Sequence, residues 1–376
     1  MPDDALPEEW EIVRDWLPDN LNERARTHQF FQRKRGLTDA ECWLRLILMH
    51  VAGGLSLEQT AVRARELGLA QISGVALFKR LRRAEAWLSD LCRYLLAEQQ
   101  RRLGRGVWPL HYRVRAIDAT DIQEPGSTGT AWRIHYSIRL PELICDHYEL
   151  TDARGGEKLG RFEFAKGDLV LVDRGYSHRA GAAKVLQSGA ALLLRWNPAT
   201  FPVTMANGKD VDLLGALRGL PPRGAGQWKL QFQHEDKIYF LRLCALRKNR
   251  VAAARSLRQV QRKAQRNGSQ AQAQSLELSG YILVLTSLPE EKFSASQVLQ
   301  LYRCRWQVEL AFKRLKSLLG AGHVPKSDDE SARAWMQAKI LTSLLLERLL
   351  LEARIFSPWG YELPDDQPLA RDVGGA

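Results

Sequence analysis

The chain has 376 residues, 45% of them hydrophobic and 26% charged, so it is long enough for two or three compact units and has the composition of an ordinary soluble globular protein. A formal net charge of +12 favours a polyanionic partner, nucleic acid above all, although charge alone leaves room for a basic protein that binds none. Five widely spaced cysteines argue against a disulfide framework or a structural zinc site, and no apolar run is long enough for a signal peptide or a membrane span, so we expect a cytoplasmic protein without membrane contact.

The first part of the chain has the residue spacing and the capping residues of helices. Ser56 and Gln59 fit a capping box that starts a helix, and Gly68 is a natural left-handed terminator for it. Ser73 is expected to cap a further helix that runs through Leu88. A helix, a short turn and a second helix resemble a helix-turn-helix.

The second of these helices carries a group of basic residues beside apolar positions that can pack inward. We expect the basic group to contact DNA phosphates, and the alternative is a helical pair whose arginines only face solvent. The group consists of Lys79, Arg80, Arg82 and Arg83.

From residue 112 the pattern changes to β-strands, with alternating or continuous branched and apolar residues. Strands are predicted at residues 114–122, 132–138, 145–151, 168–173 and 191–196, with a helix at 178–187 before the last. Further on we predict strands at 228–234, 237–246 and 281–285, a basic helical segment at 247–266, and helices at 295–318 and 331–353.

These elements divide the chain into an all-helical N-terminal domain, a core in two parts, an insertion and a tail. The corresponding residues are 1–110 for the helical, DNA-binding domain, 111–196 for the first part of the core, 197–280 for a β-rich insertion with a basic segment, 281–355 for the second part of the core, and 356–376 for a loosely ordered tail.

One stripe of polar residues on the helix at 295–318 is the sharpest signal of a site. At about 100° per residue, Tyr302, Arg305, Glu309 and Lys316 fall within an arc of about 60° along one edge of the helix. A single carboxylate among Tyr, Arg and Lys is unusual for a solvated face. The alternative is an amphipathic helix with a surface ion pair between Arg305 and Glu309.

Two aspartates in the predicted strands are candidates to join Glu309. Asp118 lies within a β-forming stretch, where a carboxylate is costly to bury unless it is paired or binds a metal. Asp173 ends an apolar strand, although Asp-Arg-Gly is also a common turn. Asp121 competes with Asp118, but it points to the opposite face of the strand. Three such carboxylates suit Mg²⁺, and two ions promote phosphoryl transfer.

The spacing Tyr-x2-Arg-x3-Glu-x6-Lys at Tyr302, Arg305, Glu309 and Lys316 resembles the signature of bacterial DDE transposases of the insertion-sequence-four group. Residues 117–120 and 171–176 are similar to the two aspartate motifs of that group, and the likeness covers approximately residues 30–350.

The resemblance implies an α/β fold with an RNase H-like catalytic core, an all-helical N-terminal domain and a mainly β insertion between the second Asp and the Glu. Asp118, Asp173 and Glu309 would bind two Mg²⁺ ions, with Mn²⁺ able to substitute. Water would attack at the end of the element, and the freed 3′-hydroxyl would attack again in cut-and-paste transposition.

The resemblance also implies partners. Tyr302, Arg305 and Lys316 would contact phosphates near the cleavage point. A homodimer would hold two terminal inverted repeats in a synaptic complex, bind target DNA and associate with the nucleoid. Some relatives stack a tryptophan before the last helix on a flipped base, and Tyr281 is the aromatic residue that stands in for it here.

Three other functions remain open on the sequence. An RNase H-like nuclease or resolvase shares the acidic triad but needs neither an end-binding domain nor the Tyr-Arg-Glu-Lys stripe. A DNA-binding regulator needs none of the acids, all of which are present. Charge alone also permits a protein that binds no nucleic acid.

Overall fold

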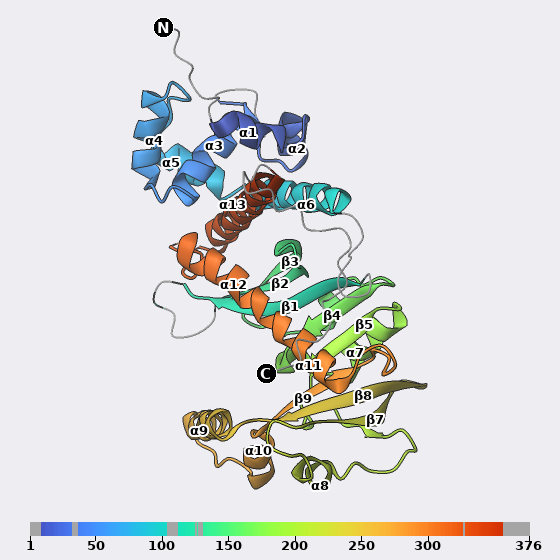
Figure 1. The fold of residues 1–376 in the computed structure, drawn as a ribbon. Coiled ribbons are helices and arrows are strands. Elements are labelled where there is room, and N and C mark those ends of the chain that lie inside the picture. The colour runs from blue at the N-terminus through green and yellow to red at the C-terminus, as the bar shows by residue number, and fades with distance from the viewer. Residues whose placement is uncertain are drawn as a thin grey trace, which may run out of the picture.

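The computed structural model describes residues 9–31, 37–103, 112–124, 126, 131–325 and 328–355. At its centre lies one mixed sheet of nine strands in the order β3-β2-β1-β4-β5-β9-β8-β7-β6, with helices against it (Figure 1). The strands are β1 (Arg113–Ile122), β2 (Trp132–Leu140), β3 (Ile144–Asp152), β4 (Asp168–Val172), β5 (Ala191–Arg195), β6 (Thr204–Met205), β7 (Ala225–His234), β8 (Lys237–Arg247) and β9 (Tyr281–Thr286).

The middle of the sheet is parallel, and the flanks are antiparallel. β4 runs parallel to both β1 and β5, whereas every other neighbouring pair is antiparallel. Ile117 of β1 is the partner of Val172 of β4, so the next residues of these two strands, Asp118 and Asp173, follow at adjacent positions. Carboxyl ends of parallel strands are where α/β proteins gather ligands.

The N-terminal part is helical, as predicted, and the long C-terminal helix packs on it (Figure 1). The capping box of Ser56 and Gln59 is formed, and Gly68 has a φ of +66°. These helices are α1 (Glu9–Asp15), α2 (Leu21–Thr27), α3 (Ala40–Val51), α4 (Leu57–Glu66), α5 (Gly74–Leu81), α6 (Glu85–Arg102) and, from the C-terminal part, α13 (Asp329–Ile355).

The helix predicted from Ser73 through Leu88 is wrong in its extent. Ser73 caps it, but α5 ends at Leu81, and α6 begins at Glu85. The Ala84 N–H donates to the Leu81 carbonyl and closes a turn between them. The break gives the two helices separate directions, so each buries its own apolar face.

The predicted insertion at 197–280 continues the central sheet. β8 pairs with β9, and β7 and β6 follow it outward. The region also contains three helices, α8 (Leu213–Arg218), α9 (Arg250–Arg266) and α10 (Ala273–Leu278). α9, the basic segment predicted to be helical, has no buried residue.

The helix predicted at 295–318 is present but interrupted. It consists of α11 (Ala295–Arg303), a 3-10 turn at Cys304–Trp306, α12 (Gln307–Lys313) and a π-helical turn at Arg314–Leu318. In Figure 1 the orange α11 and α12 run obliquely across the sheet. α12 packs against β1 and β2, which brings its polar edge over the end of β1.

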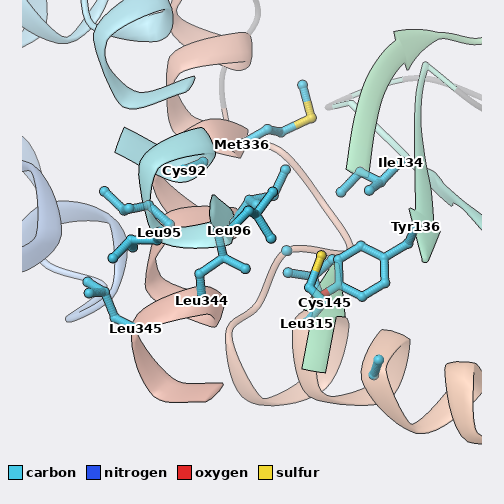
Figure 2. Packing of buried hydrophobic residues seen from close by; sticks show 14 of the residues in the cluster. Cys92, Leu95, Leu96, Ile134, Tyr136, Cys145, Leu315, Met336, Leu344 and Leu345 are labelled. Atoms are coloured by element: carbon cyan, nitrogen blue, oxygen red, sulfur yellow. The ribbon is translucent and has the colours of Figure 1, made fainter. Parts of the chain in front are cut away.

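Alternate strand residues build two cores on opposite faces of the sheet. Leu169 and Leu171 of β4 belong to one core, and Val170 and Val172 belong to the other. The first core joins the N-terminal helices, α11, α12 and α13, and Figure 2 shows side chains of α6, α13, β2 and β3 meeting there. The second core is covered by α7 (Arg179–Gln187) and α8.

No helix within the described ranges is long and apolar enough to cross a membrane. The tail predicted at 356–376 lies outside the described residues.

Candidate active site

The two aspartates predicted from the strands lie side by side at the parallel centre of the sheet. Asp118 follows the last β1 residue that pairs with β4, and Asp173 directly follows β4. The Asp118 side chain is 19% exposed, and that of Asp173 is 35% exposed, so both reach the surface from a largely buried base.

Arg305 joins the first aspartate to the glutamate of the helix. Its Nη1 donates to Asp118 Oδ2 at 2.9 Å, and its Nη2 donates to Glu309 Oε1 at 2.8 Å. The Arg305 side chain is only 12% exposed, so this guanidinium is enclosed by the site. The ion pair between Arg305 and Glu309 that the alternative predicted is present, and the same guanidinium also binds Asp118, so the polar edge of the helix faces this aspartate.

Asp173 is held by two further residues. The Tyr302 hydroxyl lies 3.2 Å from Asp173 Oδ1 and 3.3 Å from the Val172 carbonyl oxygen, so it can donate to either. Arg195, the last residue of β5, places Nη1 3.7 Å from Asp173 Oδ1. Tyr302 is buried and its hydroxyl faces Asp173, so it supports this aspartate, and its contact with a DNA phosphate stays a prediction.

The carboxylates of the site act on one another. Burial is the largest cause that raises the pKa of Asp118, and the charges of Asp173 and Glu309 raise it further. The Ala119 N–H and Arg305 act in the opposite direction. Three like charges so close together require positive charge nearby.

The chemistry of these donors fits a hard divalent cation. All three candidates offer carboxylate oxygens, which Mg²⁺ prefers. In the described ranges no three His, Cys, Asp or Glu side chains form a ready coordination group. Between Asp118 and Glu309 lies the Arg305 guanidinium, which supplies positive charge there.

Asp121, the competitor of Asp118, is engaged elsewhere. Its side chain is 50% exposed and accepts from Arg133 Nε at 2.8 Å. Burial lowers the pKa of Lys316, and the charge of Asp121 raises it in part, which indicates that Lys316 lies near Asp121. The structure therefore brings Asp118, Arg305 and Glu309 together and leaves Lys316 at the margin of the site.

The four basic residues predicted to contact DNA differ in their surroundings. Lys79 and Arg83 are exposed. Arg80 turns inward, where it donates to the Phe30 carbonyl and lies over aromatic rings of the N-terminal core. Arg82 forms ion pairs with two acidic residues near the start of α13. Helical spacing alone did not reveal these tertiary partners.

Tyr281 does not reach the site as a stacking surface. It is the first residue of β9 and is 6% exposed within the second core. Strand alternation directs its ring inward, so the structure corrects the expectation that it stacks on a base.

A basic cavity of about 550 Å³ beside the triad was not predicted. Tyr302 and Arg305 line it, and Trp306 stands at it with 49% of its surface exposed. The basic residues that line it include Arg195, Arg223, Lys248 and Arg303. Burial lowers the pKa of Lys248 to about 8, and the charges of Arg195 and Arg174 add to this effect. These residues come from strands, loops and α11, so no local motif identifies the cavity.

The amino-acid sequence matches one family of known proteins. The profile described as "Transposase DDE domain" matches residues 149–345. The putative transposase InsL for insertion sequence element IS186A of Escherichia coli K12 is 33% identical over 349 residues, which are 91% of this chain and 93% of that protein. The transposase for IS421 of Escherichia coli is 33% identical over 350 residues, with the same coverage.

More distant relatives are also transposases. The transposase for IS231F of Bacillus thuringiensis subsp. israelensis is 22% identical over 92% of this chain and 80% of that protein. Among solved structures, a piggyBac transposase synaptic complex with hairpin DNA has a TM-score of 0.46 and 10% identity, and the match covers 90% of this chain and 74% of that one. The chain thus belongs to the DDE transposase family, whose members use divalent metal, and it is the transposase of an insertion sequence, an enzyme that cleaves DNA and transfers its strands.

Proposed function

We propose that Asp118, Asp173 and Glu309 are the catalytic triad of this transposase and hold two Mg²⁺ ions, for which Mn²⁺ can substitute. The observation that carries the proposal is the Arg305 bridge, which ties a carboxylate of β1 to a carboxylate of α12 beside Asp173. Metal bound there would activate the attacking oxygen and stabilise the leaving one.

The remaining residues of the stripe position the acids and the DNA. Tyr302 fixes Asp173 through its hydroxyl. Arg305 orients Asp118 and Glu309, and together with Lys316 it supplies positive charge for the phosphates near the cleavage point. From this stripe we infer that the chain belongs to the insertion-sequence-four group of the family.

The larger organisation follows from the same assignment. We infer an RNase H-like core in which the helical N-terminal domain binds the terminal inverted repeats, and a homodimer holds two ends for cut-and-paste insertion into target DNA. Lys79 and Arg83 are the proposed phosphate contacts, while Arg80 and Arg82 hold their helix in place. The proposed domains are 1–110, 111–196 with 281–355 as the core, and 197–280 as the insertion.

The test is cleavage of DNA that carries the inverted repeats flanking the gene, with Mg²⁺ present. Asp118→Asn, Asp173→Asn and Glu309→Gln should each reduce cleavage by more than about 100-fold, beyond the effect of losing an outer-shell partner, while binding to the ends persists. Asp121→Asn is the matched control and should cleave.

Loss of cleavage in Asp121→Asn together with activity in Asp118→Asn would overturn the assignment. Cleavage without joining to a second DNA would indicate a nuclease, and stable binding without cleavage by the unaltered protein would indicate a regulator.

A further inference from the structure

A fourth carboxylate, that of Glu157, lies beside the triad. Glu157 belongs to the segment between β3 and β4 and is half-buried. In the described part of the chain its side chain has neither a hydrogen bond nor an ion pair. A half-buried carboxylate without a partner is costly unless a ligand neutralises it.

The Glu157 carboxylate points at the segment that carries Asp173. It lies directly over Gly175, two residues beyond Asp173, and any Cβ at that glycine would overlap it. Burial is the largest cause that raises the pKa of Glu157, and the charge of Asp118 is the next. The charge of Arg133 lowers this pKa, and the charge of Asp173 raises it. Glu157 is thus near both aspartates of the triad.

A buried hydroxyl is directed at the same place. Tyr176 is 1% exposed, and in the described structure its hydroxyl has no hydrogen-bond partner. Burial is the main cause that raises the pKa of Tyr176, and the charges of Glu157 and Asp118 follow, so these two carboxylates lie in the neighbourhood of the hydroxyl. An orphaned buried hydroxyl indicates a missing ligand or water. Glu157, Gly175 and Tyr176 line a cavity of about 620 Å³, which Arg133, Lys158 and Lys184 also line, and Glu157 is its one carboxylate among the described residues.

The loop that presents Glu157 is fastened by two arginines. Arg133 Nη1 donates to the Gly155 carbonyl at 2.9 Å, and Arg161 Nε donates to the Gly156 carbonyl at 3.1 Å. One of these arginines belongs to β2 and the other to a 3-10 turn at Leu159–Arg161, so the backbone immediately before Glu157 is held from both sides. Such support is what a ligand residue requires.

We propose that Glu157 is a fourth carboxylate of the metal site and contributes an oxygen to a divalent cation shared with Asp118 and Asp173. The inference rests on the triad proposed above. A cation is the occupant because an anion would be repelled by three carboxylates, and oxygen donors suit Mg²⁺ and Mn²⁺.

The test measures binding of Mn²⁺ alone to the full-length protein, by the EPR signal of free Mn²⁺ during titration. Glu157→Gln should weaken Mn²⁺ binding about 10- to 100-fold, the range found when the surroundings of a metal are altered. Gly175→Ala should act in the same direction, because its Cβ displaces the carboxylate without removing it.

Matched controls separate these effects from general damage. Glu163→Gln removes a carboxylate whose side chain is 91% exposed and pairs with Lys184, and it should bind Mn²⁺ normally. Gly160→Ala adds a Cβ with no atom within 4 Å and should also bind normally. Unchanged far-ultraviolet circular dichroism shows that each variant is folded. If Glu157→Gln does not fold, Gly175→Ala decides the outcome.

The outcomes distinguish this inference from the triad itself. If Asp173→Asn loses Mn²⁺ binding and Glu157→Gln and Gly175→Ala do not, the triad stands and the fourth carboxylate is refuted. If Asp173→Asn binds Mn²⁺ normally, the triad fails. Loss in all three variants supports both proposals.

Discussion

At the scale of single residues, the site depends on side chains that hold other side chains. Arg305 binds two carboxylates at once, and Tyr302 reaches from α11 to the end of β4. These contacts fix the acids before any cation arrives, which reduces the reorganisation needed for catalysis.

Removing the Tyr302 hydroxyl should therefore loosen Asp173 without removing it. Tyr302→Phe is expected to lower the cleavage rate about 10- to 100-fold, as the loss of a residue that holds a metal ligand does. It should also raise the Mg²⁺ concentration needed for half-maximal rate. The measurement is cleavage rate against Mg²⁺ concentration. Tyr239→Phe is the control, because its hydroxyl only accepts from the exposed Gln187. An unchanged Mg²⁺ requirement in Tyr302→Phe would refute the supporting role.

Strand ends and helical spacing in the sequence predicted Asp118, Asp173 and Glu309 as the triad. The structure places the two aspartates at adjacent strand positions and links Asp118 to Glu309 through Arg305. The sequence did not identify Arg195 or Glu157. Arg195 lies beside Asp173 and the Glu157 carboxylate lies over Gly175, and neither residue stands in a sequence pattern that differs from an ordinary strand end or loop. The sequence also did not reveal that Arg80 turns inward, because its aromatic partners are distant in the chain.

At the scale of elements, α13 connects the N-terminal helices to the sheet through a buried acid. Glu347 accepts from the Tyr136 hydroxyl at 3.0 Å and from the Cys145 N–H at 2.8 Å. Burial raises the pKa of Glu347 from its ordinary value of 4.5 to about 7, while its two hydrogen bonds oppose this rise. Side chains around this contact are drawn in Figure 2.

This raised pKa predicts a pH dependence of stability. The protonated acid favours the folded state, so its contribution is complete below pH 4.5 and is lost as pH rises through about 7. The full loss is on the order of 3 kcal/mol. In Glu347→Gln, an amide can accept from Cys145 and donate to Tyr136, so that loss should be absent.

Thermal unfolding at pH 5 and pH 8 measures this effect. The Tm advantage of Glu347→Gln over the unaltered protein should be larger at pH 8 than at pH 5. Glu98→Gln, at a surface ion pair with Arg101, should show no such change. If the Tm difference between Glu347→Gln and the unaltered protein is the same at pH 5 and pH 8, Glu347 is ionised in the folded protein.

Most helices and strands were predictable because they depend on local features. The Ser56 capping box and the alternation in β2 are examples. The break between α5 and α6 and the 3-10 turn at Cys304–Trp306 were not predicted. Both accommodate packing directions set by other elements, which local propensity does not contain.

At the scale of the whole molecule, chain segments far apart in sequence form common structures. The strands of 197–280 extend the central sheet, and one core joins the N-terminal helices to α13. Sequence order suggested separate units, because long-range pairing leaves no local signal. The net charge of +12 is also a property of the whole chain, and it suits a DNA-binding enzyme.

The proposed DNA contact of the N-terminal domain predicts a salt effect. Lys79→Ala should weaken binding to the terminal repeats and reduce the slope of log affinity against log salt by about 1, because one phosphate contact is lost. Binding is measured at several salt concentrations. Lys209→Ala, an exposed lysine of the insertion, is the control. An unchanged slope in Lys79→Ala would place the DNA contact elsewhere.

Anomalous diffraction from crystals of the protein with DNA ends and Mn²⁺ locates the ions themselves and so tests the proposed triad. Mn²⁺ peaks are expected within bonding distance of Asp118, Asp173 and Glu309. Peaks bound to Asp121 instead of Asp118, or a Glu309 carboxylate that contacts no Mn²⁺ while the ends are in place, would contradict it.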